Sequence, residues 1–364
     1  MASDGRGSKK RTNKKVTVLI VLLIILAVLA AAAAFLLTRS KPEPETPLDF
    51  NREVGDENEE TAAADTPTVD EDAANSALDQ LDGESSSQPT RDEGWSHYLL
   101  LGVDGETDSY TAKRSDAMIV LSVNQDEGRV VLSSVPRDTL VYIDGKNGFD
   151  KLTHAYAYGG ADLTVQTFEQ NFDIDIENYF TVNFAAMEEI VDLVGGVTIT
   201  LTDAEAKHMG EYYAAWGLSG GTQVLNGKEA LAYCRIRKID SDYKRNDRQF
   251  AVLMAIYDEV KDLSVGQYTE LISTVYNHMY TDMTLAGAIS LVGDLLSVTE
   301  NGTIENVKLV DSEHSSAASL DGRSVVLVDN LEQTAIRWRE ALGIDDYEPS
   351  ARLKQISEAL EELK

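Results

Sequence analysis

The sequence predicts a mixed α/β domain, close to α+β, in which helices cover both faces of a central sheet. Apolar, β-branched runs of strand length recur from Trp95 onward, and segments with apolar residues at helical spacing alternate with them. Short polar turns separate the two kinds of segment. This alternation is typical of domains built from one sheet and its covering helices. With 364 residues, the chain is long enough for one large domain or two ordinary ones.

The expected strands are short runs with few charged residues. They cover residues 97–103, 117–123, 129–135, 139–143, 176–184, 197–201 and 304–310. Only the polar stretch NQDEG, residues 124–128, separates the second run from the third. A loop this short favours an antiparallel hairpin, because parallel neighbours need a much longer crossover.

The expected helices follow from apolar spacing and from helix-ending residues. They cover residues 161–172, 185–196, 226–237, 246–262, 265–280, 284–298 and 327–342. Gly195 and Gly196 are placed to end the second of these helices. Asn226 is a good first residue for the third. The tail, residues 346–364, contains a short amphipathic helix that we expect on the surface or disordered.

The N-terminus predicts a membrane anchor. Residues 16–37 form an uncharged apolar run of 22, which as a helix spans roughly 30 Å of hydrocarbon. Residues 1–15 before it are basic, so the positive-inside rule places them in the cytoplasm and the rest of the chain outside the cell. A cleaved signal peptide is the alternative, but its apolar core is usually about 7–15 residues long. We therefore expect an uncleaved, single-pass anchor in the cell membrane.

Residues 38–93 predict a disordered acidic linker. The stretch 42–93 holds seventeen acidic residues against two arginines, and five of the seven prolines lie in 39–93. The expected folded domain, residues 94–345, follows. Residues 94–364 hold 22 basic and 44 acidic residues, which argues against nucleic acid as a partner. The single cysteine, Cys234, excludes an intramolecular disulfide and a cysteine metal cage.

Charged residues gather at the ends of the first three expected strands. Asp104 follows the first strand, and Arg114 and Asp116 precede the second. Arg137 and Asp138 follow the third. If the second and third strands form a hairpin, Asp116 and Arg137 share one end of the sheet. Asp104 joins them if the first strand is antiparallel to the second.

A second group of arginines lies in residues 235–249. Its members are Arg235, Arg237, Arg245 and Arg248. Arginine grips phosphate through a planar, bidentate fork, and aspartates together with phosphate oxygens commonly hold Mg²⁺. Arginines and aspartates at one rim therefore point to a pyrophosphate–Mg²⁺ site. The plainer alternative is that they are solvated edge residues with ordinary salt bridges.

Separated motifs, in their order along the chain, resemble the LytR–CpsA–Psr family of cell-envelope phosphotransferases. They are LLLGVD (99–104), RSDAMIVLSVN (114–124), SSVPRDT (133–139), KLTHAYAYGG (151–160), the stretch 181–197, VLNGKEALAYCRIR (224–237) and RNDRQ (245–249). The resemblance covers about residues 95–345. It implies a central, mostly antiparallel or mixed sheet, flanked by helices, with an apolar pocket for a lipid. A short basic cytoplasmic end and one membrane anchor also match family members.

The resemblance also implies an activity. Family members transfer a glycopolymer such as teichoic acid or capsule polysaccharide from a polyprenyl-pyrophosphate carrier to peptidoglycan. A phosphodiester forms and polyprenyl phosphate leaves. The apolar stripes in 182–194 and 250–260 are candidates for the lipid-pocket walls, although such stripes are more often simple core.

Family roles transfer to matching positions of this sequence. Asp104 and Asp116 match the acidic pair associated with Mg²⁺ (or Mn²⁺), and with Arg137 they are the predicted catalytic residues. The predicted pyrophosphate ligands are Arg114, Arg137, Lys151, Arg235, Arg237, Arg245 and Gln249. Asp104 or Asp116 could act as the general base, and the sequence does not separate them. Lys238 stands where members often carry histidine or arginine.

Two other functions fit the same residues. A polyprenyl-pyrophosphate hydrolase would use the same arginines and metal with water as the nucleophile. A membrane-anchored envelope regulator or attenuator would use no chemistry at all. The basic residues 1–15 are too short for a helix-turn-helix, which argues against direct DNA binding.

Overall fold

A computed structural model describes most of the expected domain. The described residues are 66–69, 89–103, 114–146, 148–212, 216–236, 239–240, 242–260, 279–284, 291 and 303–364. The predicted anchor at 16–37, most of the linker and the expected helix at 284–298 lie outside them, apart from Thr284 and Leu291. Within this part of the chain, no helix has both the length and the apolar character needed to cross a bilayer.

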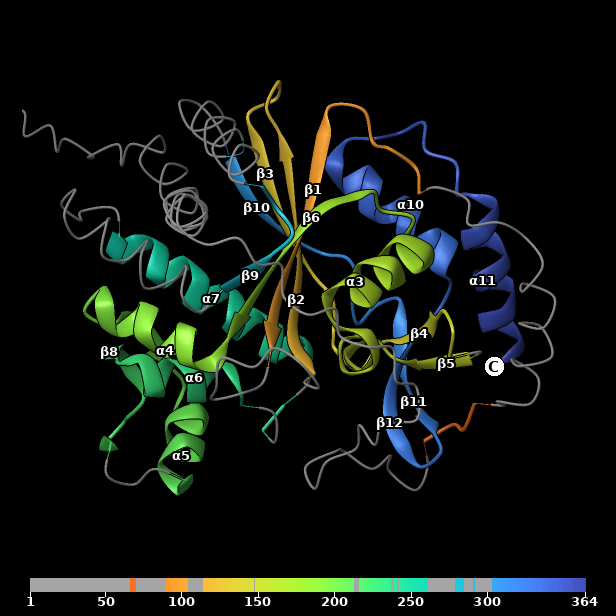
Figure 1. Ribbon diagram of the computed structural model, residues 1–364. Helices are drawn as coiled ribbons and strands as arrows, with labels where there is room; N and C mark the ends of the chain where they lie inside the picture. Colours follow the sequence, from red (N-terminus) through yellow and green to blue (C-terminus); the bar gives the residue numbers. More distant parts are fainter. Residues whose placement is uncertain are drawn as a thin grey trace, which may run out of the picture.

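Six strands form the central sheet, at the middle of the molecule in Figure 1. In spatial order they are β10 (Thr303–Lys308), β3 (Arg129–Ser134), β2 (Ser115–Asn124), β1 (Trp95–Val103), β6 (Ile176–Asn183) and β9 (Met279–Thr281). The pairs β1–β2, β2–β3 and β6–β9 are antiparallel, whereas β10–β3 and β1–β6 are parallel. The sheet is therefore mixed.

Strand register brings the ends of β1, β2 and β3 to one edge. The predicted hairpin is confirmed, because Asn124 pairs with Arg129 across the turn between β2 and β3. Strand β1 is antiparallel to β2, with Val103 opposite Ser115. The end of β1, the start of β2 and the end of β3 thus lie together, which is the arrangement the hairpin hypothesis requires.

Side chains alternate between the two faces of the sheet, as the twofold period of a strand requires. In β1, Leu99, Leu101 and Val103 join one hydrophobic cluster, whereas Tyr98 joins the other. Helices α3 (Leu152–Phe172), α10 (Leu331–Leu342) and α11 (Ala351–Glu362) cover the first face. Helices α4 (Phe184–Leu193), α5 (Asp203–Tyr212), α6 (Gly227–Cys234) and α7 (Asp242–Val260) lie on the other side in Figure 1.

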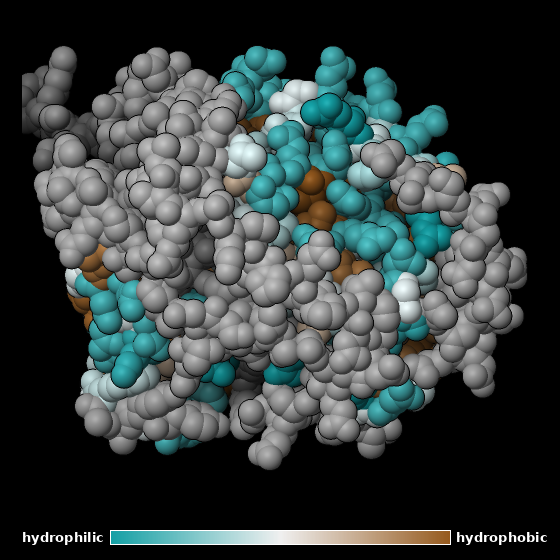
Figure 2. Space-filling view, viewed as in Figure 1, coloured by the Kyte–Doolittle hydropathy of each residue, from teal (hydrophilic) through white to brown (hydrophobic). Residues whose placement is uncertain are grey.

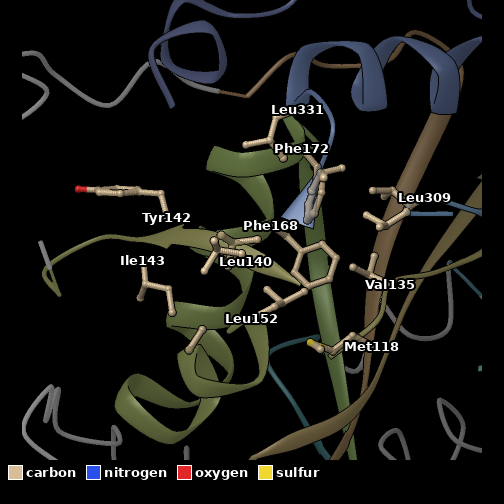
Figure 3. Close-up of a cluster of buried hydrophobic side chains, with 14 of the residues drawn as sticks. Met118, Val135, Leu140, Tyr142, Ile143, Leu152, Phe168, Phe172, Leu309 and Leu331 are labelled. Atoms are coloured by element: carbon tan, nitrogen blue, oxygen red, sulfur yellow. The ribbon is translucent and has the colours of Figure 1, made fainter. Parts of the chain in front are cut away.

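Helix α3 forms the centre of the first face. Figure 3 shows Phe168 and Phe172 among Val135, Leu309 and other apolar side chains, and both rings are fully buried. The helix begins nine residues before its expected start at 161, because a kink at Gly159 and Gly160 joins two helical segments. Gly160 has φ of 67°, a left-handed conformation that glycine adopts without strain.

Helix boundaries on the second face follow the expected capping chemistry. Helix α6 starts after Asn226, whose side chain accepts a hydrogen bond from the Glu229 amide, while the Glu229 side chain returns to the Asn226 amide. This reciprocal pair is a capping box. Helix α4 is followed by Gly195 and Gly196, with φ of 90° and 97°. Strands β7 (Val197–Leu201) and β8 (Gly221–Leu225) form a separate two-stranded antiparallel sheet beside these helices, and α5 lies between them in the chain.

Two hairpins flank α3 and correct two expectations, and β9 of the central sheet corrects a third. The expected strand 139–143 forms β4 (Leu140–Ile143), but it pairs with β5 (Gly148–Lys151) instead of joining the central sheet. The first residues of the expected helix 327–342 belong to strand β12 (Arg323–Val328), which pairs with β11 (Ser315–Leu320). The helix starts later because Asn330 caps it. Strand β9 occupies the end of the segment expected to be helical at 265–280.

Segments outside the expected domain also pack onto it. The tail helix was expected on the surface or disordered, yet in α11 Leu353, Ile356 and Leu360 are buried in the core of the first face. Within the expected linker, the Val69 amide donates to the Ser319 carbonyl at 3.0 Å, so this short segment extends the β11–β12 hairpin. On the face shown in Figure 2, the described surface side chains are mainly hydrophilic, and hydrophobic ones form small patches.

Candidate active site

The edge where β2 begins and β3 ends carries an ion pair between Asp116 and Arg137. Arg137 Nη1 donates to Asp116 Oδ1. The pair forms because the Val135 amide donates to the Met118 carbonyl at 3.1 Å, which continues the β2–β3 ladder to its last residues. Asp116 remains about 20% exposed, whereas Arg137 is about 5% exposed. The contact that the hairpin predicted is confirmed.

The start of α3 fastens this edge. The Thr153 amide donates to the Arg137 carbonyl at 2.9 Å, and the Leu152 amide donates to the Thr139 carbonyl at 2.8 Å. The Thr153 hydroxyl donates to the Ser115 carbonyl at 2.8 Å. The first turn of α3 thus uses amides that have no partner within the helix to hydrogen-bond the loop that carries Arg137. Sequence reasoning missed this role of Thr153, since the helix was expected to start at 161.

Lys151 joins the ion pair through Asp138. Its Nζ lies 3.4 Å from Asp138 Oδ1, and Arg137 Nε lies 3.6 Å from Asp138 Oδ2. Lys151 is the residue before α3, and only 2% of its side chain is exposed. The structure therefore brings the predicted ligands Arg137 and Lys151 to the two oxygens of one carboxylate.

Two further arginines act on Asp116. Arg245 reaches across from α7, and its Nη2 donates to the Asp116 carbonyl at 3.2 Å. Arg114 immediately precedes β2. Burial alone would raise the pKa of the Asp116 carboxyl, but the charges of Arg137, Arg245 and Arg114 outweigh it and hold the pKa below its ordinary value. Asp116 is ionised at neutral pH, at the centre of converging cations.

The other predicted site residues are Asp104, Arg235, Arg237 and Gln249. Asp104 and Arg237 lie outside the described residues. Arg235 follows α6 with an exposed side chain, and Gln249 lies about one turn beyond Arg245 in α7, half-buried. A place in the site stays a prediction for these four.

Arg248 differs from its neighbours in residues 235–249. Its side chain is buried, with Nε donating to Glu205 Oε1 at 2.7 Å and Nη1 donating to the Ile236 carbonyl at 3.1 Å, and Nη2 contacts Asp240. These contacts fasten α5 and the segment after α6 to α7. The plainer interpretation, a salt-bridged arginine, is correct for Arg248.

A buried polar cluster that the sequence analysis missed lies next to Lys151, whose amide donates to Asp150 Oδ1 at 2.8 Å. The Asp150 carboxylate accepts hydrogen bonds from Lys146 Nζ at 2.5 Å and Tyr158 OH at 2.7 Å, and His154 Nδ1 lies 2.9 Å away. Burial raises the pKa of this carboxyl, but the contacts with His154 and Lys146 prevail and leave it well below its usual range. The only sequence signal of this cluster was the four-residue spacing of Lys146, Asp150, His154 and Tyr158.

The described donors fit Mg²⁺ in only one of its usual modes. Within the described ranges, no group of three or more His, Cys, Asp or Glu side chains is placed to hold a metal. An all-protein cage is therefore not built from these residues. Mg²⁺ is more often bound by one or two carboxylates plus substrate phosphates and water. The ionised Asp116 carboxylate, which is about 20% exposed, fits that mode.

Comparisons with known proteins bear on the same domain. The model of the LytR_cpsA_psr family matches residues 56–339. The polyisoprenyl-teichoic acid–peptidoglycan teichoic acid transferase TagT of Bacillus subtilis is 37% identical over 227 residues, which cover 60% of this chain and 69% of TagT. TagU of Enterococcus faecalis, with the same transferase description, is 34% identical over 245 residues, or 66% of this chain and 76% of TagU.

Solved structures agree with the fold. A structure of TagT bound to LI-WTA has a TM-score of 0.58 and 31% identity, and the match covers 71% of this chain and 96% of that one. A structure of TagT with bound octaprenyl pyrophosphate lipid has a TM-score of 0.54 and 29% identity, with the same coverage of 71% and 96%. The family match extends over well more than half of the sequence. The chain belongs to the LytR–CpsA–Psr family.

Proposed function

We propose that this protein transfers a glycopolymer of the teichoic acid type from a polyprenyl-pyrophosphate carrier to peptidoglycan. The observation that carries this proposal is the convergence of Arg114, Arg137 and Arg245 on Asp116, with Lys151 next to them. The domain as a whole is acidic. A local excess of buried or half-buried cations at one sheet edge therefore indicates an anionic ligand with several charges.

Transfer asks for charge neutralisation more than for covalent chemistry. In phosphoryl transfer, the phosphorus passes in line between the incoming and leaving oxygens, and negative charge must be stabilised around it. Guanidinium groups held in place before the reaction supply this stabilisation without reorganising. Arg137 and Arg245 meet this condition, since both are buried and fixed by partners from other elements.

The acceptor hydroxyl needs a base, and the charge state of Asp116 bears on its identity. A carboxylate with a lowered pKa accepts a proton poorly. We therefore assign Asp116 to holding cations, which leaves Asp104 as the candidate base. Asp116 would hold Mg²⁺ together with oxygens of the pyrophosphate and water. Bound there, Mg²⁺ would neutralise charge on the pyrophosphate.

The second face of the sheet offers a place for the polyprenyl chain. Apolar side chains of α4 and α7 that pack against its core are only partly buried, and these are Met187, Leu193, Phe250, Leu253 and Met254. They belong to the two stripes that the sequence singled out. Helix α7 also carries Arg245, so the same helix would contact the headgroup and the lipid.

The expected organisation of the chain is part of this proposal. Residues 1–15 would lie in the cytoplasm, 16–37 would span the membrane, and the catalytic domain would face the cell wall. This side of the membrane holds both the lipid-linked polymer and the peptidoglycan acceptor. The pyrophosphate bond itself supplies the driving force, so no nucleotide is needed.

The test is transfer by the full chain in detergent, supplied with a lipid-linked teichoic acid precursor, Mg²⁺ and peptidoglycan. The expected result is polymer attached to peptidoglycan together with released polyprenyl phosphate. The Arg137→Met variant is expected to lose this activity. Arg91→Met is the matched control, because Arg91 is 78% exposed and lies before β1, at the end of that strand away from the site. Phosphate release without a conjugate would favour the hydrolase instead.

A further inference from the structure

Asp138 contacts two cations of the proposed site but has no role in it so far. Its Oδ2 lies 3.6 Å from Arg137 Nε, and its Oδ1 lies 3.4 Å from Lys151 Nζ. The side chain is about 12% exposed. Because each oxygen faces a different cation, the carboxylate lies between the arginine of the β3 end and the lysine that precedes α3.

The backbone of Asp138 is fixed from both sides. The Val326 amide of β12 donates to the Asp138 carbonyl at 2.8 Å. The next residue, Thr139, donates its amide to the Pro136 carbonyl at 3.1 Å and accepts from the Leu152 amide at 2.8 Å. The loop is therefore held by its own turn, by α3 and by the β11–β12 hairpin. A carboxylate on such a backbone has little freedom to follow its partners.

Arg137 is thus held at two points by two different carboxylates. Asp116 contacts Nη1, and Asp138 contacts Nε. Asp116 is the more exposed of the two, at about 20% against 12%. An incoming pyrophosphate, or a cation that comes with it, would compete for the Asp116 contact first. The contact with Asp138 would then keep the planar guanidinium oriented.

We infer that Asp138 is a positioning residue, which holds Arg137 and Lys151 in the orientation that stabilises the transferred phosphate. This inference rests on the proposed function. Asp138 is not expected to touch the substrate. Its effect reaches the reaction through the two cations, and a conservative variant that keeps the negative charge should preserve most of it.

Asp138→Asn separates positioning from simple electrostatics. Loss of a negative charge beside an anionic substrate would by itself tighten binding and leave turnover unchanged. Positioning predicts the opposite pattern: kcat falls about tenfold, the order expected when one close charged partner is removed, while KM changes by less than about threefold. Steady-state kinetics of the full chain with a lipid-linked precursor and peptidoglycan measures both constants.

Two variants complete the test. Asp138→Glu keeps the charge and should retain kcat within about threefold of the wild type. Asp144→Asn is the control, because Asp144 lies just after β4 and accepts hydrogen bonds from Gln166 and Tyr142, away from the site. It should leave both constants unchanged. Thermal unfolding of each variant confirms that it is folded.

Three results would overturn the inference. They are wild-type kcat and KM in Asp138→Asn, wild-type kcat with tighter substrate binding in that variant, or equal losses of kcat in the Asn and Glu variants, which would indicate that shape matters instead of charge. If Asp138→Asn does not fold, the Glu variant alone decides, and a tenfold loss of kcat at an unchanged Tm would count against positioning. Failure of the proposed function would look different, because the wild type itself would then form no conjugate.

Discussion

Two arginine–aspartate clusters lie at opposite ends of strand β1, and they do different things. At the first end, Arg339 donates to Asp92 Oδ1 at 2.7 Å and to the Asp173 carbonyl at 2.5 Å. At the second end, Arg137 pairs with Asp116 and Asp138. Both clusters join an arginine to acidic residues beside strand ends. The sequence pattern alone does not distinguish them.

Exposure and the origin of the partners make the difference. Arg339 and Asp92 are 0% and 2% exposed, and the His97 ring, 3.1 Å from Asp92, completes a buried network. Its members come from β1, α10 and the segment after α3, so the network joins parts of the fold. The Arg137 cluster leaves Asp116 about 20% exposed and gathers additional cations around it. A cluster that is closed by its own partners stabilises the fold, whereas one with surplus positive charge at a rim is suited to a ligand.

The largest expected effect is on stability, at the buried cluster. Arg339→Met leaves the Asp92 carboxylate buried with its main cation removed, and breaking a buried pair in this way costs about 3–5 kcal/mol. Urea unfolding should show this loss. Transfer activity per folded molecule should stay near that of the wild type, because the cluster lies at the far end of β1 from the site. A large loss of activity in the folded fraction would contradict a purely structural role for the Arg339 cluster.

The next effect is on catalysis, at the exposed cluster. Arg137→Met removes a guanidinium aimed at developing charge, which typically lowers kcat about 10²–10³-fold. The free energy of unfolding should change less than in Arg339→Met, because Asp116 reaches solvent. Kinetic and unfolding measurements on both variants should therefore show the larger loss of stability in Arg339→Met and the larger loss of kcat in Arg137→Met. Parallel losses of stability and activity in both would contradict the assignment.

A smaller effect appears in the pH dependence of stability. Burial raises the pKa of the Asp92 carboxyl, but the hydrogen bond with His97 and the charge of Arg339 hold it below its ordinary value. A carboxyl with a lowered folded-state pKa stabilises the protein above its unfolded pKa of about 3.9, and this contribution is lost as the pH falls. The free energy of unfolding, measured with urea between pH 6 and pH 3, should therefore fall less steeply with decreasing pH in Asp92→Asn than in the wild type. Equal slopes in the two proteins would show that Asp92 does not contribute to the pH dependence of stability.

The smallest effect concerns a half-buried carboxyl of α3 that lies outside both clusters. Burial and the nearby charge of Asp175 raise the pKa of Glu169 to about 7. A raised pKa means that the folded state is favoured at low pH and loses stability as the pH rises through about 7. Glu169→Gln should therefore stabilise the protein by about 1 kcal/mol at pH 8, after allowance for solvent screening, and change little at pH 5. Urea unfolding at the two pH values tests this, and the same shift at both would contradict it.

Local sequence signals predicted the strands whose ends carry the candidate site, but not how some of the elements around them begin or pack. The β2–β3 hairpin was predictable because a short polar turn separates two apolar runs. The tail helix was also predicted, but its packing into the core was not, because the burial of Leu353 and Ile356 depends on α3 and α10, which the tail sequence does not encode. Similarly, the expected helix at 327–342 includes the last two residues of β12, Leu327 and Val328, since the apolar run VVLV fits either structure until the Asn330 cap is recognised.

The candidate site shows the same limit. Asp116, Arg137 and Arg245 were predicted together and lie together, because strand ends and the family motifs both pointed to them. Asp138 and Thr153 gained roles only from the structure, since their partners on Lys151 and Ser115 depend on how α3 docks. Arg248 belongs to the same arginine-rich segment but was not among the predicted ligands, and the structure pairs it with Glu205 and Asp240.

The most direct measurement is the binding of geranyl pyrophosphate, a short polyprenyl probe, to the full chain by calorimetry. Wild type and Arg339→Met, corrected for the folded fraction, should bind with equal affinity, and Arg137→Met should bind at least about tenfold more weakly, as expected when a charge-assisted contact is lost. Equal affinity in all three proteins, or no binding to the wild type, would contradict the claim that the Arg137 cluster is the pyrophosphate site.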